Sequence, residues 1–178
     1  MNIVILTGSP RHHGNSNYLA DRFQQGAEQS GHHVERFDCT APNLHDCVAC
    51  NRCGMNGDCA VHDDFSDILR PRLLEADMVV FVTPMYYFGF SGYLKRVIDR
   101  FYAINESLRS APKKTALIMA CAGNDEKNTE PMLLHYRALA AYLGWEDAGT
   151  ILATGLGAEG SAADTPYCDA AYALGLSL

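Results

Sequence analysis

Short apolar runs alternate with amphipathic stretches along the whole chain, and this alternation narrows the choice of fold more than any other feature of the sequence. The run Met78–Val82 is apolar at every position, as expected of a parallel strand that is covered on both faces. Residues 15–30 instead place Leu19, Phe23 and Ala27 at helical spacing. Strands that alternate with helices in this way predict a parallel sheet with helices on both faces.

The alternation resolves into five strands and five helices. The predicted strands span residues 2–7, 33–37, 78–82, 115–120 and 147–153, and the predicted helices span residues 15–30, 63–75, 93–107, 130–143 and 166–178. Five strands with right-handed connections suit a three-layer α/β fold of the flavodoxin-like type, with strand order 2-1-3-4-5. We expect one domain over residues 1–178, with a cysteine-rich loop at about 39–62 and another loop at 83–92.

The net charge and the lack of long apolar runs argue against nucleic acid and membranes as partners. The 178 residues include 14 Lys and Arg against 21 Asp and Glu, which gives a net charge of −7. Phosphate contacts dominate the affinity of proteins for nucleic acids, so nucleic acid is not an expected partner. No run approaches the roughly 20 apolar residues of a membrane helix, and the first residues do not resemble a secretory signal. We therefore expect a cytoplasmic protein without a membrane partner.

In a sheet with this strand order, ligands bind beyond the carboxyl ends of the strands, where the order reverses. The loop after the first strand is rich in hydroxyl and amide groups and leads into a helix. Its candidate anion-binding residues are Ser9, Arg11, Asn15, Ser16 and Asn17. Free backbone N–H groups at a helix start favour an anion, and the loop has neither GxGxxG nor a Walker A lysine. The alternative is that Asn15 or Ser16 only caps the helix and the loop is solvated.

The loops after the third and fourth strands are candidates for holding a flat ring. The former is unusually aromatic and consists of Pro84, Met85, Tyr86, Tyr87, Phe88 and Gly89. A soluble chain seldom exposes such a patch without a use for it, so it predicts a ring-binding surface, a subunit contact or both. The loop after the fourth strand offers small residues at Cys121, Ala122 and Gly123, although a plain turn explains them nearly as well.

These loops resemble those of the NAD(P)H-dependent FMN reductases. The resemblance lies in Gly8-Ser9-Pro10-Arg11 with Gly14-Asn15-Ser16 after the first strand, and in Pro84-Met85-Tyr86-Tyr87-Phe88 after the third. It implies that the first loop holds the FMN phosphate and the second lines the isoalloxazine ring. It also implies NAD(P)H as electron donor, a small acceptor such as a quinone, a flavin or an azo compound, and a homodimer or homotetramer. Hydride transfer needs no side-chain acid or base, so no catalytic residue is expected.

Four of the seven cysteines form a compact C-x2-C-x2-C-x5-C motif. They are Cys47, Cys50, Cys53 and Cys59. Two-residue gaps let consecutive thiols face one centre, and Gly54 and Gly57 allow the chain to turn back. A [4Fe–4S] cluster, which takes four thiolates, a zinc ion and free thiols all remain compatible with this spacing.

The same motif resembles that of the iron–sulfur flavoproteins, a branch of the FMN reductase fold. That resemblance implies a [4Fe–4S] cluster on the four cysteines. It also opens an alternative function, in which FMN and the cluster carry electrons to a redox protein partner. Because the motif follows the second strand, we expect it near the carboxyl edge of the sheet, within electron-transfer range of a flavin or of a partner subunit's flavin.

Overall fold

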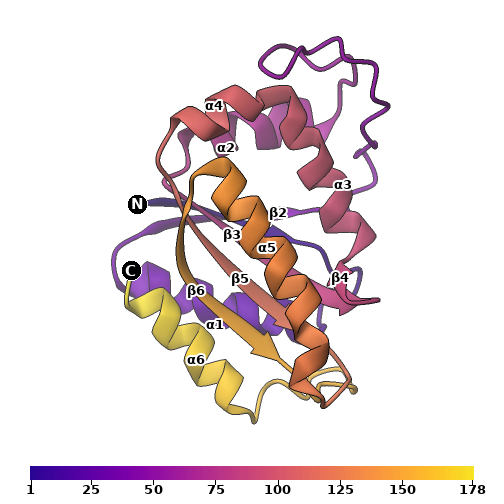
Figure 1. The fold of residues 1–178 in the computed structure, drawn as a ribbon. Coiled ribbons are helices and arrows are strands. Elements are labelled where there is room, and N and C mark those ends of the chain that lie inside the picture. The colour runs from indigo at the N-terminus through magenta and orange to yellow at the C-terminus, as the bar shows by residue number, and fades with distance from the viewer.

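The computed structural model covers residues 1–178 and is built around a parallel sheet (Figure 1). The parallel strands are β1 (Asn2–Thr7), β2 (His33–Asp38), β3 (Met78–Tyr86), β5 (Lys114–Ala120) and β6 (Glu146–Ala153). They lie in the order β2-β1-β3-β5-β6, and the short strand β4 (Gly89–Phe90) pairs antiparallel with β3. Counted among the parallel strands alone, this is the predicted order 2-1-3-4-5, so the predicted fold class is confirmed.

Helices cover the sheet on both faces, as the unbroken apolar strand β3 requires (Figure 1). The helices are α1 (Asn15–Gln29), η1 (Phe65–Leu69), α2 (Arg70–Glu75), α3 (Gly92–Arg100), η2 (Phe101–Ile104), α4 (Asn105–Ser110), η3 (Glu126–Thr129), α5 (Glu130–Leu143) and α6 (Pro166–Leu176). On one face, Phe23 of α1 and Ala171 of α6 pack in one cluster with Val80 of β3. On the other face, helices α2 to α5 form a separate cluster with Phe81, the next residue of β3. The alternating side chains of one strand therefore belong to two cores.

Three of the predicted elements differ from the structure. The predicted loop 83–92 is wrong in part, because β3 continues to Tyr86 and turns back into β4. Tyr87 and Phe88 form the turn with φ values of 45° and 66°. Two such left-handed residues are typical of a hairpin turn that usually carries Asn-Gly, and the absence of that signal explains the error. The predicted helix 93–107 is instead divided into α3, η2 and α4.

The predicted helix 63–75 is also divided. It begins as the π-helix η1, and α2 starts at Arg70 with Pro71 in its first turn. Proline is tolerated there because the first N–H groups of a helix have no partner within it. No helix or strand covers residues 41–62, as expected of the cysteine-rich loop. None of the helices has the length and apolar character needed to cross a membrane.

Helices α1 and α6 approach each other closely through two glycines. A Cβ atom at Gly26 would lie 2.1 Å from the carbonyl oxygen of Tyr172, and one at Gly175 would lie 2.1 Å from that of Phe23. Backbone oxygens cannot rotate away as side chains do. The two helices can therefore pack at this distance only while both positions lack a side chain.

We expect Gly26→Ala to destabilise the protein. In a helix, alanine is favoured over glycine by about 1 kcal/mol, but overpacking against a fixed backbone costs about 1–3 kcal/mol. The overlap should outweigh the gain, and urea titration should show a lower free energy of unfolding. Gly92→Ala is the control, since a Cβ there meets nothing within 4 Å. Equal stability of Gly26→Ala and the wild type would contradict the close packing of α1 and α6.

Candidate functional site

A pocket of about 300 Å³ opens at the carboxyl edge of the sheet, where the predicted loops converge. Its lining residues are Ser9, Arg11, Gly14, Asn15, Ser16, Pro84, Met85, Tyr86, Ala120, Cys121, Ala122, Leu156, Gly157 and Glu159. Most of the predicted cofactor-binding residues are among them. The predicted residues that lie outside the lining are Asn17, Tyr87, Phe88, Gly89 and Gly123. One pocket thus joins segments more than a hundred residues apart in the chain.

One end of the pocket is the start of α1. The residue before the helix is Gly14, and no side chain caps the helix. The first helical hydrogen bond runs from Tyr18 N–H to the Gly14 carbonyl. The backbone N–H groups of residues 15–17 precede that bond and so have no partner within the helix. With the positive end of the helix dipole, they form a site for an anion.

The loop before α1 is held in place by its own polar side chains. Arg11 N–H donates to Ser9 Oγ at 3.2 Å, and the Asn17 side-chain amide donates to the carbonyls of Arg11 at 2.9 Å and His12 at 3.3 Å. The amide of Asn17 is therefore engaged with the loop and does not face the pocket. Its backbone N–H is the group that remains available to a ligand.

Asn15 connects this loop to the segment that follows β6. Its side-chain amide donates to the carbonyls of Leu156 at 3.2 Å and Ala158 at 2.7 Å, and its Oδ1 accepts from Ala162 N–H at 3.1 Å. The segment after β5 is tied to the same region, because Leu156 N–H donates to the Cys121 carbonyl at 2.8 Å. Three loops are thereby fixed around one pocket.

The sequence analysis missed the loop after β6, which contributes Leu156, Gly157 and Glu159. The prediction placed the ligand where the strand order reverses, so it considered only the loops that follow the central strands. Strand β6 lies at the edge of the sheet, away from that point. One signal was available, since every parallel strand ends at the same edge of the sheet. No sequence pattern, however, indicated that Asn15 would bring this outer loop inward.

The β3–β4 hairpin forms the other end of the pocket. Pro84, Met85 and Tyr86 line it, while Tyr87 at the turn is 99% exposed. Beside them, since Pro84 pairs in register with Ala120, the Cys121 thiol donates to the Gly123 carbonyl at 3.6 Å. Burial raises the pKa of the Cys121 thiol, although the contact with Gly123 opposes the change. This end of the pocket is therefore apolar and uncharged, in contrast to the end at α1.

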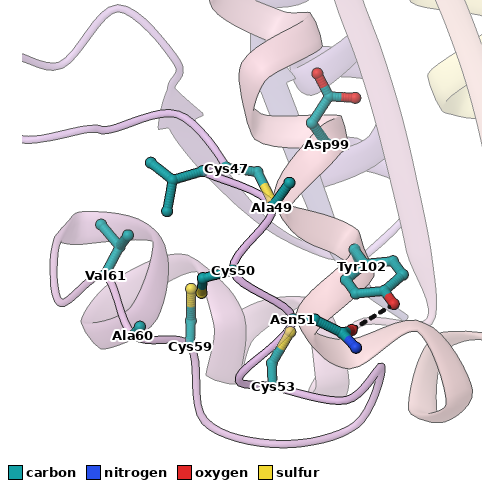
Figure 2. A pocket seen from close by; sticks show the side chains of 11 residues that line it. Cys47, Ala49, Cys50, Asn51, Cys53, Cys59, Ala60, Val61, Asp99 and Tyr102 are labelled. Atoms are coloured by element: carbon teal, nitrogen blue, oxygen red, sulfur yellow. Dashed lines mark hydrogen bonds between the residues drawn. The ribbon is translucent and has the colours of Figure 1, made fainter.

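The cysteine motif lines a second cavity, of about 500 Å³ (Figure 2). Its lining residues are Cys47, Val48, Ala49, Cys50, Asn51, Cys53, Cys59, Ala60, Val61, Asp99 and Tyr102. All four predicted metal ligands thus share one cavity. As placed in this structure, no three His, Cys, Asp or Glu side chains lie close enough together to hold a single metal ion. The soft sulfur donors and the mostly apolar wall suit an iron–sulfur or zinc centre better than a hard cation.

The position of this second cavity corrects the expectation that it lies at the carboxyl edge. The cysteine loop packs against η2 and α4, where Tyr102 donates to Asn51 Oδ1 at 2.8 Å and Ser107 donates to Asn56 Oδ1 at 2.6 Å. The other end of α3 adjoins the first pocket, since Ser91 Oγ donates to the Gly8 carbonyl at 2.6 Å. The nine residues of α3, about 13 Å of helix, therefore separate the two regions within one chain (Figure 1).

Comparison with known proteins identifies the family of the chain. Residues 1–158 match the family described as NADPH-dependent FMN reductase. The chain belongs to the NADPH-dependent FMN reductase family. It is 29% identical over 129 residues to an iron–sulfur flavoprotein of Archaeoglobus fulgidus, which covers 71% of this chain and 58% of the relative. The chain spans little more than half the length of the iron–sulfur flavoproteins that it matches.

Two further relatives cover the chain more completely. A Bacillus subtilis protein, named as an NAD(P)H-dependent FMN-containing oxidoreductase, is 27% identical over 166 residues, with 87% of this chain and 86% of that protein covered. The crystal structure of an azoreductase from Bacillus anthracis covers the whole of both chains with a TM-score of 0.76 and 16% identity. The latter similarity concerns the fold alone.

Proposed function

We propose that residues 1–178 act as one FMN-binding unit and transfer electrons from NAD(P)H to a small acceptor such as a quinone, a flavin or an azo compound. The observation that carries this proposal is the pocket itself, which joins an uncapped helix start to an apolar, aromatic hairpin. When bound, FMN supplies the hydride-accepting chemistry. The residues of the chain bind it, orient it and limit the access of water.

The polar end of the pocket suits the FMN phosphate. We assign the phosphate to the backbone N–H groups of residues 15–17, the hydroxyls of Ser9 and Ser16, and the guanidinium of Arg11. Charge-assisted hydrogen bonds of an arginine to a phosphate are stronger than neutral ones. Asn15 and Asn17 support this end indirectly, because their side chains hold the surrounding loops.

The apolar end suits the isoalloxazine ring. We assign one edge of the ring to Pro84, Met85 and Tyr86, and the other to Cys121 and Ala122 with the adjacent backbone of Gly123. No side chain in this region is a charged acid or base, so its role is to position the ring. Nicotinamide and acceptor would then reach the same open face in turn.

The first test is Ser16→Asp. Ser16 is almost fully buried at the helix start, where a carboxylate would occupy the anion site and repel a phosphate. We expect the variant to lose FMN affinity by at least about tenfold, which corresponds to 1.4 kcal/mol, as measured by quenching of flavin fluorescence. Ser110→Asp adds the same charge at the distant end of α4 and should bind FMN normally. Unchanged affinity in Ser16→Asp would refute the phosphate assignment.

The exposed hairpin supports the proposal of a homodimer or homotetramer. Tyr86, Tyr87 and Phe88 are exposed, and Tyr87 and Phe88 adopt left-handed conformations that are unfavourable for aromatic residues. A contiguous exposed aromatic surface usually marks a contact. We propose that a second copy covers Tyr87, Phe88 and Gly89 and that these residues complete the ring site across the interface.

Light scattering tests this assembly. The FMN-loaded protein should have the mass of two or four chains, and Tyr87→Asp with Phe88→Asp should lower that mass by placing charges in the contact. Leu74→Asp is the control, since it replaces a single exposed apolar residue on α2. A mass of one chain for the FMN-loaded wild type would contradict the proposal.

A second candidate function is electron carriage by an iron–sulfur flavoprotein, with a redox protein as partner. The observation that favours it is the convergence of all four motif cysteines on one cavity. Cys47, Cys50, Cys53 and Cys59 would provide the four thiolates that a [4Fe–4S] cluster takes. A cluster would add one-electron chemistry to the two-electron chemistry of the flavin.

Anaerobic reconstitution tests this second function. We expect about four iron and four sulfide per chain, as for a cubane with four cysteine ligands, and a lower yield when Cys59 is changed to Ser. Cys168→Ser is the control, because Cys168 is buried in α6 outside the motif. No iron uptake, or one stable zinc ion per chain, would leave the FMN reductase as the sole proposed function.

A further inference from the structure

Two arginines on α3, one helical turn apart, bind the segment that contains the cysteines. Arg96 donates to the carbonyls of Cys39 at 2.8 Å, Ala41 at 3.2 Å and Leu44 at 3.2 Å. Arg100 contacts the residues that follow in this segment, beginning with His45. The segment that leaves β2 is therefore held against α3 before the cysteine motif begins.

Arg100 binds the chain on both sides of the motif. Its Nη1 donates to the His45 carbonyl at 2.9 Å, two residues before Cys47. Its Nη2 donates to the Val61 carbonyl at 3.1 Å, two residues after Cys59. One guanidinium thus joins the two ends of the loop that carries all four cysteines.

A carboxylate completes this junction. Asp63 accepts from Arg100 Nη1 at 2.9 Å and from Nη2 at 3.2 Å, and it also accepts from His45 N–H at 2.8 Å. The Arg100 and Asp63 side chains are 1% and 0% exposed. The two ends of the loop are therefore linked twice. Arg100 binds a backbone carbonyl at each end, and Asp63, just after the motif, binds the backbone N–H of His45, just before it.

The charge of Arg100 lies beside the cavity. Its Nη2 donates to the carbonyl of Val61, which lines the cavity. The side chain is a cation, because the guanidinium of arginine is not deprotonated in proteins. Its Nε is buried and has no nitrogen or oxygen partner within the chain, so one donor remains unused.

Local spacing and loop closure make different contributions to the cavity. Cys47, Cys50 and Cys53 are each separated by two residues, so their presence in one cavity requires only a short stretch of chain. Cys59 follows five residues later and reaches the same cavity only if the two ends of the loop meet. Closing a loop costs conformational entropy, which a fixed contact at its ends offsets.

We propose that Arg100 is the positioning residue of the cysteine cavity. It closes the loop, brings Cys59 into the cavity that the other three cysteines line, and provides a buried positive charge next to the thiolates of a bound cluster. The part of this proposal that concerns a cluster rests on the iron–sulfur function proposed above. The part that concerns the placement of Cys59 does not, because it applies to the protein without metal.

Cross-linking of the reduced, metal-free protein tests the placement. Dibromobimane joins thiols that lie within a few ångströms of each other, and peptide mapping identifies each joined pair. The variant Arg100→Gln with Asp63→Asn removes both charges and leaves no lone buried carboxylate. We expect it to lower the yield of cross-links between Cys59 and either Cys50 or Cys53 by at least about fivefold. The Cys47–Cys50 cross-link, which depends on local spacing, should remain within twofold of the wild type.

A second variant and a control make the test independent of the stability of the double variant. Arg100→Lys keeps a charge for Asp63 but lacks the fork that reaches both ends of the loop, so it should also lower the Cys59 yields. Lys113→Met is the control. Lys113 is another buried cation that donates to backbone carbonyls, those of Leu74 and Ala76, and it does not contact the cysteine loop. Its Cys59 yields should equal those of the wild type.

The outcomes distinguish the positioning role of Arg100 from the proposed iron–sulfur function. Selective loss of Cys59 cross-links in either Arg100 variant supports the positioning role, whether or not the wild type takes up iron. Wild-type yields of Cys59 cross-links in both variants overturn it. An equal loss of the Cys47–Cys50 cross-link, or the same loss in Lys113→Met, also overturns it, because either result indicates general unfolding.

If the wild type takes up no iron, the proposed iron–sulfur function fails, but the proposed role of Arg100 in placing Cys59 does not.

Discussion

Burial of β3 on both faces is the constraint on which the rest of the structure depends. Val79 and Phe81 belong to one core and Val80 and Val82 to the other, so both faces of the strand must be covered by helices. Side chains on the faces of the sheet are then committed to packing. Only the strand ends remain open to ligands, and the pocket at the carboxyl edge follows from that arrangement.

Helix α3 connects the two regions that carry chemistry. At its start, Ser91 binds Gly8 and accepts from Leu94 N–H, which ties the helix to the first loop of the pocket. At its end, Arg100 binds both ends of the cysteine loop. A rigid helix keeps the two regions apart within one chain.

Much of the pocket was predictable because it depends on local patterns. The polar loop before α1 and the aromatic segment after the core of β3 are visible as short runs in the sequence. Their convergence follows from strand order alone. The roles of single side chains were less predictable. Asn15 and Asn17 were expected to contact a phosphate, but their side chains bind backbone of the neighbouring loops instead.

The sequence by itself determined the alternation of strands and helices, the polar loop before α1 and the grouping of four cysteines, because each of these is visible in the spacing of nearby residues. The order of the parallel strands followed from the general rules of connection in such alternating folds. Only the tertiary structure decided that the loop after β6 enters the pocket, that Tyr87 and Phe88 form a hairpin turn, and that the cysteine loop lies at the far end of α3. The first and the third of these features depend on hydrogen bonds between residues distant in the chain, such as Asn15 with Ala158 and Arg100 with His45, and no local pattern encodes such pairs. The turn at Tyr87 and Phe88 is local, but it lacks the Asn-Gly pair that usually marks such a hairpin.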